Sequence, residues 1–185
     1  QLVERLKDNP ASRSYASGGV GSAAHVGAAM MLRVVGAEGV VHVPYRTTAA
    51  VFPDLLSNRV DFSMSTLDSM ISYVQSGDLR PLLVAGPNRL PSLPDVPTGA
   101  EAGYPDLRAS SWYVLQVPSS TPKAIVLLLN KEVNTILKEP EMVAWFKQNE
   151  QTAMPDFTPE TAFKFYEQER ERWEPHVKAS GASAQ

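Results

Sequence analysis

Strand-like and helix-like patterns alternate along the first half of this sequence, and the alternation constrains the fold more than any other feature. Short runs rich in β-branched and aromatic residues predict strands at 13–17, 40–45, 60–65 and 79–85. Amphipathic runs between them predict helices over 22–35, 49–56 and 67–75. Strands joined by helices at this spacing form right-handed βαβ units, so we expect an α/β fold with a mainly parallel sheet flanked by helices.

The pattern changes after residue 117. One more strand is predicted at 112–117, and Thr121 is expected to cap the helix that follows it. Three helices are predicted beyond it, at 122–137, 140–148 and 158–178. Helices with one apolar stripe need a surface to cover, and no strands accompany these. The chain also begins inside a helical pattern at Gln1, with neither a Met nor a cap, so we expect a domain boundary and a truncated N-terminus.

Composition excludes several classes of function. The chain has 185 residues, a formal net charge of −3 and no cysteine. The charge argues against nucleic acid as a partner, because a phosphate backbone calls for a concentrated basic face. Without cysteine there are no disulfides and no thiolate ligands for zinc. The longest apolar run, 124–129, is far shorter than the roughly 20 residues that span a bilayer, so no membrane insertion is expected.

A glycine-rich turn is the most informative segment. Residues 18–22, Gly-Gly-Val-Gly-Ser, follow a predicted strand and open a predicted helix. The free N–H groups of a first helical turn and the positive end of the helix dipole favour an anion, and the hydroxyls of Ser17 and Ser22 add donors. The turn therefore predicts a site for a carboxylate or a phosphate. The alternative is a turn that only packs the helix on the sheet.

Three predicted strands end in hydroxyl-bearing segments with little charge. In open parallel sheets ligands bind at the carboxyl ends of the strands, so these segments are expected to converge on one ligand. The predicted ligand-binding residues are Ser17, Gly18, Gly19, Gly21, Ser22, Ala23, Tyr45, Thr47, Ser65 and Thr66.

Catalytic and metal-binding patterns do not emerge from the sequence. No Gly-x-Ser-x-Gly elbow and no histidine pair at metal-ligand spacing occurs. His25 favours helix packing over ligand contact, and His42 is expected to be structural. Asp61 and Asp68 would either orient a ligand amine or serve in turns and caps. We therefore predict a binding protein rather than an enzyme, with no catalytic residue, metal or cofactor.

A nucleotide-using enzyme is the second hypothesis. Gly19, Gly21 and Ala24 match the permissive dinucleotide fingerprint. That fingerprint needs an acid at the end of the next strand, but Glu38 precedes the strand. The phosphate loop needs a lysine after its glycine, and Ser22 stands there. A third hypothesis is a fragment without activity of its own.

Several motifs in order resemble those of the Bug family, the periplasmic substrate-binding proteins of tripartite tricarboxylate transporters. They are Tyr-Ala-Ser-x-Gly-x-Gly-Ser-x-x-His at 15–25, His-Val-Pro-Tyr-Arg at 42–46, Leu-Pro-Asp-Val-Pro-Thr at 93–98 and Glu-Ala-Gly at 101–103. The resemblance covers nearly the whole chain, and the order of the motifs makes it specific.

The resemblance implies a clamshell of the periplasmic-binding-protein type II class, which delivers a small carboxylate or related polar solute to a membrane permease. It implies that 1–111 form a nearly complete second domain with the glycine turn. Residues 112–185 would cross back to a first domain whose N-terminal part is absent, and the exposed faces could drive a non-native dimer. The implied location is the periplasm, although the chain carries no signal peptide. Thr47 replaces a frequent glycine, and Ser65 and Thr66 replace frequent acids or amides, so the ligand is not carried over from relatives.

Overall fold

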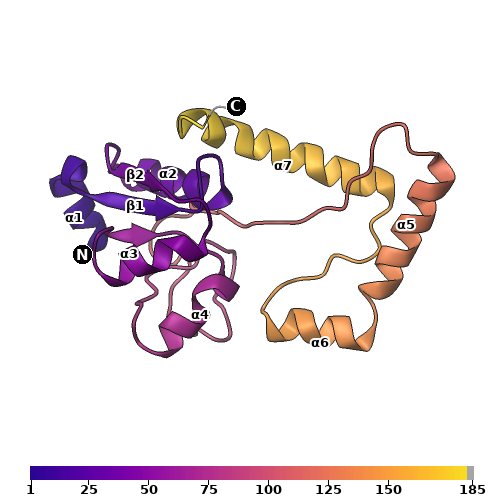
Figure 1. The fold of residues 1–185 in the computed structure, drawn as a ribbon, viewed down its shortest axis with the longest axis horizontal. Helices are drawn as coiled ribbons and strands as arrows, with labels where there is room; N and C mark the ends of the chain where they lie inside the picture. The colour runs from indigo at the N-terminus through magenta and orange to yellow at the C-terminus, as the bar shows by residue number, and fades with distance from the viewer. Residues whose placement is uncertain (183–185) are drawn as a thin grey trace. The chain divides into compact units, whose positions relative to one another are not determined.

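The computed structural model describes residues 1–182, which belong to two compact units (Figure 1). The first unit comprises Gln1–Ser111 and the chain from Glu174, and the second comprises Trp112–Trp173.

A three-stranded parallel sheet forms the centre of the first unit. Strands β1 (Ser14–Ser17), β2 (Val41–Pro44) and β3 (Phe62–Ser63) are arranged in the order β2-β1-β3. Tyr15 is paired with His42 on one side and with Phe62 on the other. Because β1 lies between two parallel neighbours, the α/β prediction with a parallel sheet is confirmed for this part of the chain.

Helices cover both faces of this sheet, because successive residues of β1 point to opposite faces. Tyr15 packs into a core with α1 (Leu2–Asp8) and α2 (Ala23–Val35). Ala16 packs on the other face with Val51, which belongs to the short helix η2 (Ala49–Val51). The remaining elements of this unit are η1 (Pro10–Ser12), α3 (Phe52–Leu56) and α4 (Leu67–Gln75).

Local sequence explains where α2 begins and ends. Ser22 caps it, since its Oγ accepts a hydrogen bond from the His25 N–H at 3.2 Å. Gly36 ends it in the left-handed conformation, with φ of 69°. The predicted helix over 22–35 is therefore confirmed at both ends.

Two predicted strands are wrong. The segment 79–85 contributes only an isolated bridge between Val84 and Thr98, because Pro81 has no N–H to donate to a ladder. The segment 112–117 is extended but pairs with no strand among the described residues. Its side chains are accordingly exposed, Tyr113 by 88% and Leu115 by 68%.

The second unit is helical, as expected for the sequence after residue 117. It contains α5 (Lys123–Ile136), α6 (Pro140–Gln148) and most of α7 (Pro159–Ala179). The predicted Thr121 cap is wrong: Pro122 is the N-cap residue of α5, and no side chain caps it. Trp112 packs edge-on against Tyr166 of α7 and donates its indole N–H to Glu169 at 2.9 Å.

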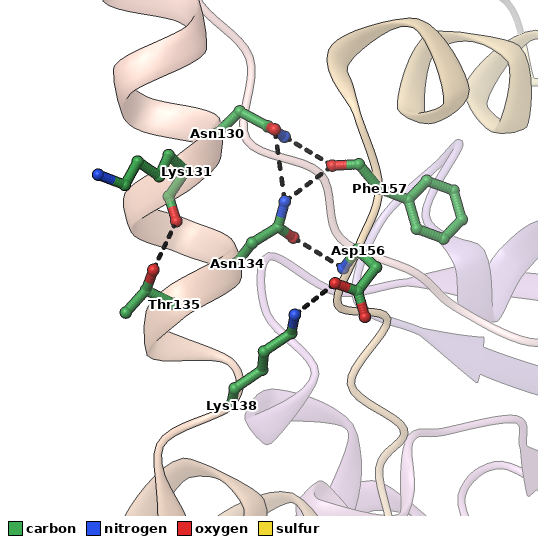
Figure 2. A network of polar contacts seen from close by, with 7 residues as sticks. All are labelled: Asn130, Lys131, Asn134, Thr135, Lys138, Asp156 and Phe157. Carbon is green, nitrogen blue, oxygen red and sulfur yellow. Dashed lines mark hydrogen bonds and ion pairs between the residues drawn. The ribbon is translucent and has the colours of Figure 1, made fainter.

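Two asparagines on α5 hold the loop that precedes α7, as Figure 2 shows. The Phe157 carbonyl accepts hydrogen bonds from Asn130 Nδ2 at 2.8 Å and from Asn134 Nδ2 at 2.9 Å. The Asp156 N–H donates to Asn134 Oδ1 at 3.1 Å, and the Asp156 carboxylate pairs with Lys138. These contacts tie two helices together where little apolar surface is buried.

Among the described helices, none combines the length and the apolar composition that crossing a membrane requires.

Asp61 anchors β1 rather than a ligand. Its carboxylate accepts from the Ser14 N–H at 2.8 Å and from Arg13 Nη1 at 3.3 Å. Of the two roles that the sequence allowed, the structure therefore places Asp61 in the structural one, at the start of the strand.

We expect Asp61→Ala to lower the free energy of unfolding of the first unit by about 1.5–3 kcal/mol, because it removes two hydrogen bonds to a charged group. Asp68→Ala is the matched control, since Asp68 is an exposed acid in the first turn of α4; its loss should cost less than about 1 kcal/mol. Urea unfolding followed by amide signals of β1 measures both. An equal loss of unfolding free energy in the two variants would contradict the anchoring role of Asp61.

Candidate functional site

Three loops meet at the carboxyl edge of the sheet, because β1, β2 and β3 are parallel and adjacent. The loop after β1, residues 18–22, touches the loop after β2. A Cβ on Gly18 would lie 2.8 Å from Thr48 Oγ1 and 2.9 Å from the Thr48 nitrogen. Only glycine permits this approach, so Gly18 joins the two loops.

The loop uses part of its own donors internally. The N–H of Gly19 donates to Ser17 Oγ at 3.2 Å, and that of Gly21 donates to His25 Nδ1 at 3.1 Å. The Ser22 N–H donates to the Gly19 carbonyl at 3.2 Å. The amides of Gly21 and Ser22, which were expected to hold a ligand, are therefore already engaged.

Other amides of the same turn remain open. The N–H groups of Val20, Ala23 and Ala24 donate to no residue among the 182 that the structure describes. Val20 is 59% exposed. Space is open beside Gly21, where an added Cβ would meet nothing within 4 Å. The loop thus presents an exposed set of donors at the positive end of α2, although Ala23 is the only predicted amide among them.

The two serines of the loop differ in exposure. The Ser17 residue is fully buried, and its hydroxyl donates to the Gly19 carbonyl at 3.0 Å. Ser22 is half-buried, and its hydroxyl donates to the same carbonyl at 2.7 Å. Ser17 therefore shapes the turn from below and does not face a ligand.

A stack of three rings lies under the loop. The His25 and His42 rings are 3.9 Å apart at 15°, and Tyr15 stacks on His42 at 4.8 Å. Burial lowers the pKa of His25, and burial and the neighbouring His25 lower that of His42 to about 4. Both imidazoles are therefore neutral near pH 7.

Ser17 Oγ and His42 Nε2 are 2.7 Å apart, a distance typical of a nucleophile and its base. No sequence motif reveals this pair, because the two residues are 25 positions apart. The Ser17 residue is fully buried, and its Oγ already accepts a hydrogen bond from the Gly19 N–H, so no substrate carbon can approach it. The pair holds the loop.

The loops after β2 and β3 contribute the remaining predicted residues. Tyr45 is turned away from the glycine loop, since its hydroxyl donates to Asp54 at 2.6 Å. This bond raises the pKa of Tyr45 and lowers that of Asp54. Thr47 and Thr66 are exposed, and half-buried Ser65 shares a hydrogen bond with Ser63 at 3.1 Å.

Within residues 1–182 no cluster of three or more histidine, aspartate or glutamate side chains is arranged to hold a metal ion. The donors at this edge of the sheet are amides and hydroxyls, which suit an anion bound by hydrogen bonds.

Residues 1–182 match the family described as the tripartite tricarboxylate transporter family receptor, TctC. The chain belongs to this family. The match covers both units, and it confirms the resemblance drawn from the motifs.

Two curated proteins are similar to this TctC-family chain. One, from Pseudomonas sp. strain P51, is a UPF0065 protein of the tcbD-tcbE intergenic region; it is 34% identical over 94% of the chain and 52% of its own length. Protein BugT of Bordetella pertussis is 31% identical over 98% of the chain and 55% of its own length. The chain thus spans about half the length of these relatives.

Solved structures extend the likeness. The periplasmic binding protein BugD superposes with a TM-score of 0.86 at 29% identity, over 100% of this chain and 62% of that one. Rpa4515 of R. palustris, which was solved with adipate, superposes with a TM-score of 0.85 at 29% identity. The match covers 98% of this chain and 60% of that one. The predicted fold class, an α/β fold of the periplasmic-binding-protein type with a parallel sheet flanked by helices, is confirmed.

The histidine stack should make stability depend on pH. A depressed folded-state pKa means that the unfolded chain takes up protons first, so the stabilising effect is complete above pH 6.5 and is lost as the pH falls towards about 4. We expect a loss of roughly 1–3 kcal/mol across this window. Urea unfolding of the first unit at stepped pH measures it, and His42→Phe should flatten the slope. An unchanged slope in that variant would contradict the assignment.

Proposed function

We propose that this chain is the ligand-binding part of a periplasmic receptor that captures a small carboxylate and passes it to the permease of a tripartite tricarboxylate transporter. The amides of Val20, Ala23 and Ala24, which have no partner among the described residues, carry the proposal, because they can form an anion site at the sheet's carboxyl edge. A similar protein that was solved with adipate supports a carboxylate as ligand.

Binding explains the site better than catalysis. The donors are fixed backbone groups around open space, as in sites that hold an anion without changing it. The only serine–histidine pair seen at the loop, Ser17 with His42, is buried beneath it among the described residues. Family membership likewise favours a receptor over the nucleotide-using enzyme that Gly19 and Gly21 raised as an alternative.

The two units fit a receptor with two lobes. We assign residues 1–111 to the lobe that carries the glycine loop, and residues 112–173 to the other lobe. The sequence placed 112–185 in that second lobe, but the chain from Glu174 groups with the first unit. The relatives are about twice as long as this chain, which is the length that a second complete lobe would require.

Energetics set the expected affinity. Each charge-assisted hydrogen bond contributes about 1.5–3 kcal/mol, and the helix end contributes up to about 1 kcal/mol. Association costs at least roughly 4 kcal/mol. Two or three amides alone therefore give millimolar binding, at about −4 kcal/mol, whereas a second lobe closing on the ligand would bring it towards micromolar.

We expect the 185-residue chain to bind adipate with a dissociation constant in the millimolar range. Titration followed by ¹⁵N amide shifts detects binding this weak and reports the site directly. The shifts should be largest at Val20, Ala23 and Ala24. Adipamide, which has the same length without charge, should leave them unchanged.

Ala23→Pro tests the amide itself. Ala23 is the first residue of α2, where proline is tolerated, and Ser22 already has the extended φ of −64° and ψ of 156° that proline requires before it. The variant removes one N–H without breaking the helix, so adipate should bind about tenfold more weakly at nearly unchanged stability.

Ala23→Ser keeps the N–H and is the matched control. Adipate shifts that fall elsewhere on the chain, or that survive Ala23→Pro at full affinity, would contradict the proposed site.

A further inference from the structure

Two stacked imidazoles lie directly beneath the glycine loop, and each comes from a different element. His25 is in the first turn of α2 and is only 3% exposed. His42 is in β2, half-buried, with its ring 3.9 Å from that of His25. A pair of rings at this position could serve packing alone, so the contacts of their nitrogens decide the role.

Each ring supports one glycine of the loop. His25 Nδ1 accepts the Gly21 N–H at 3.1 Å. His42 Nε2 lies 2.7 Å from Ser17 Oγ, which in turn accepts the Gly19 N–H at 3.2 Å. The second link therefore runs through Ser17, and both links end on backbone N–H groups of the loop.

The two supported glycines are also the ones with unusual backbone. Gly19 has φ of 132° and Gly21 has φ of 79°, both in the region that side chains disfavour. A peptide in this conformation has several alternatives of similar energy, so a contact that fixes its N–H also fixes the direction of its neighbours. The neighbours are Val20, between the two glycines, and Ala23, just after them.

We propose that His25 and His42 are positioning residues for the ligand: through Gly21 and through Ser17–Gly19, they turn the amides of Val20 and Ala23 towards the site. This inference rests on the proposed function and deepens it. It gives two histidines that do not themselves contact the ligand the role of orienting the amides that do. A phenylalanine pair would fill the same space but could not hold the loop.

His25 must be neutral for this role, because an imidazolium has no lone pair with which to accept the Gly21 N–H. The proton of the Ser17 hydroxyl goes to the Gly19 carbonyl, so His42 Nε2 acts as the donor to Ser17 Oγ. The titratable groups that stack on them are each other and Tyr15, on β1. Burial raises the pKa of Tyr15, so the phenol is neutral too. Burial lowers the pKa of both histidines, and the support therefore persists across ordinary physiological pH.

Two substitutions at His25 separate support from packing. His25→Asn keeps an acceptor oxygen near the position of Nδ1 but loses the ring. His25→Phe keeps a ring against His42 but loses the acceptor. We expect His25→Phe to weaken adipate binding about tenfold or more, and His25→Asn to stay within about threefold of the unchanged protein. At His42, His42→Gln and His42→Phe form the equivalent pair.

The ligand-free amide spectrum gives a second readout. In His25→Phe the Gly21 N–H should shift and exchange faster with solvent, and in His42→Phe the Gly19 N–H should do so. Leu32→Val is the stability control, because it removes volume from the core that packs against the same helix and lies away from the loop. It should leave both the glycine signals and the affinity unchanged.

The outcomes are distinct. If affinity follows stability, so that Leu32→Val and His25→Asn weaken adipate as much as His25→Phe does, the histidines only pack and the inference is overturned. Unchanged glycine signals in both phenylalanine variants would overturn it as well. If the unchanged protein binds no adipate, the proposed function fails on its own, and the glycine signals alone decide whether the histidines hold the loop.

Discussion

The position of β1 between two parallel neighbours is the constraint on which the rest of the first unit depends. Parallel pairing on both sides brings the ends of β1, β2 and β3 to one edge. The crossover from β1 to β2 runs in one direction, and the crossover from β2 to β3 returns past β1 in the other. Helix α2 therefore packs on one face and η2 with α3 on the other.

The loop has to divide a small number of donors between its own stability and a ligand. The amides of Gly19, Gly21 and Ser22 donate to internal acceptors, and those of Val20, Ala23 and Ala24 have no acceptor within residues 1–182. A loop that offered every amide to a ligand would have nothing to hold its positive φ angles in place. The internal bonds thus cost some donors and keep the remaining ones in a fixed direction, which lowers the entropy lost on binding.

The sequence predicted the elements that depend on local signals. Ser22 and Gly36 mark the ends of α2, and both ends were confirmed. It failed where a partner at long range decides the outcome. The segment 112–117 has every local property of a strand, but a strand also needs a neighbour to pair with. The same limit applies to the site: the glycine turn was visible, whereas the support from His42 through Ser17 spans 25 positions and leaves no pattern.

Backbone recognition also explains why the class of ligand is easier to infer than its identity. Amides and a helix dipole attract any carboxylate, because they interact with its negative charge and not with the rest of the molecule. One such loop can satisfy only one end of a dicarboxylate. Under the proposed function, side chains at the neighbouring strand ends and on the second lobe would discriminate between ligands. Thr47 and Thr66 are exposed at those strand ends and carry short, uncharged donors. Under the proposed function, their hydroxyls could donate hydrogen bonds to a second polar group of the ligand. Substitution of these two threonines would then be expected to alter selectivity without removing carboxylate binding.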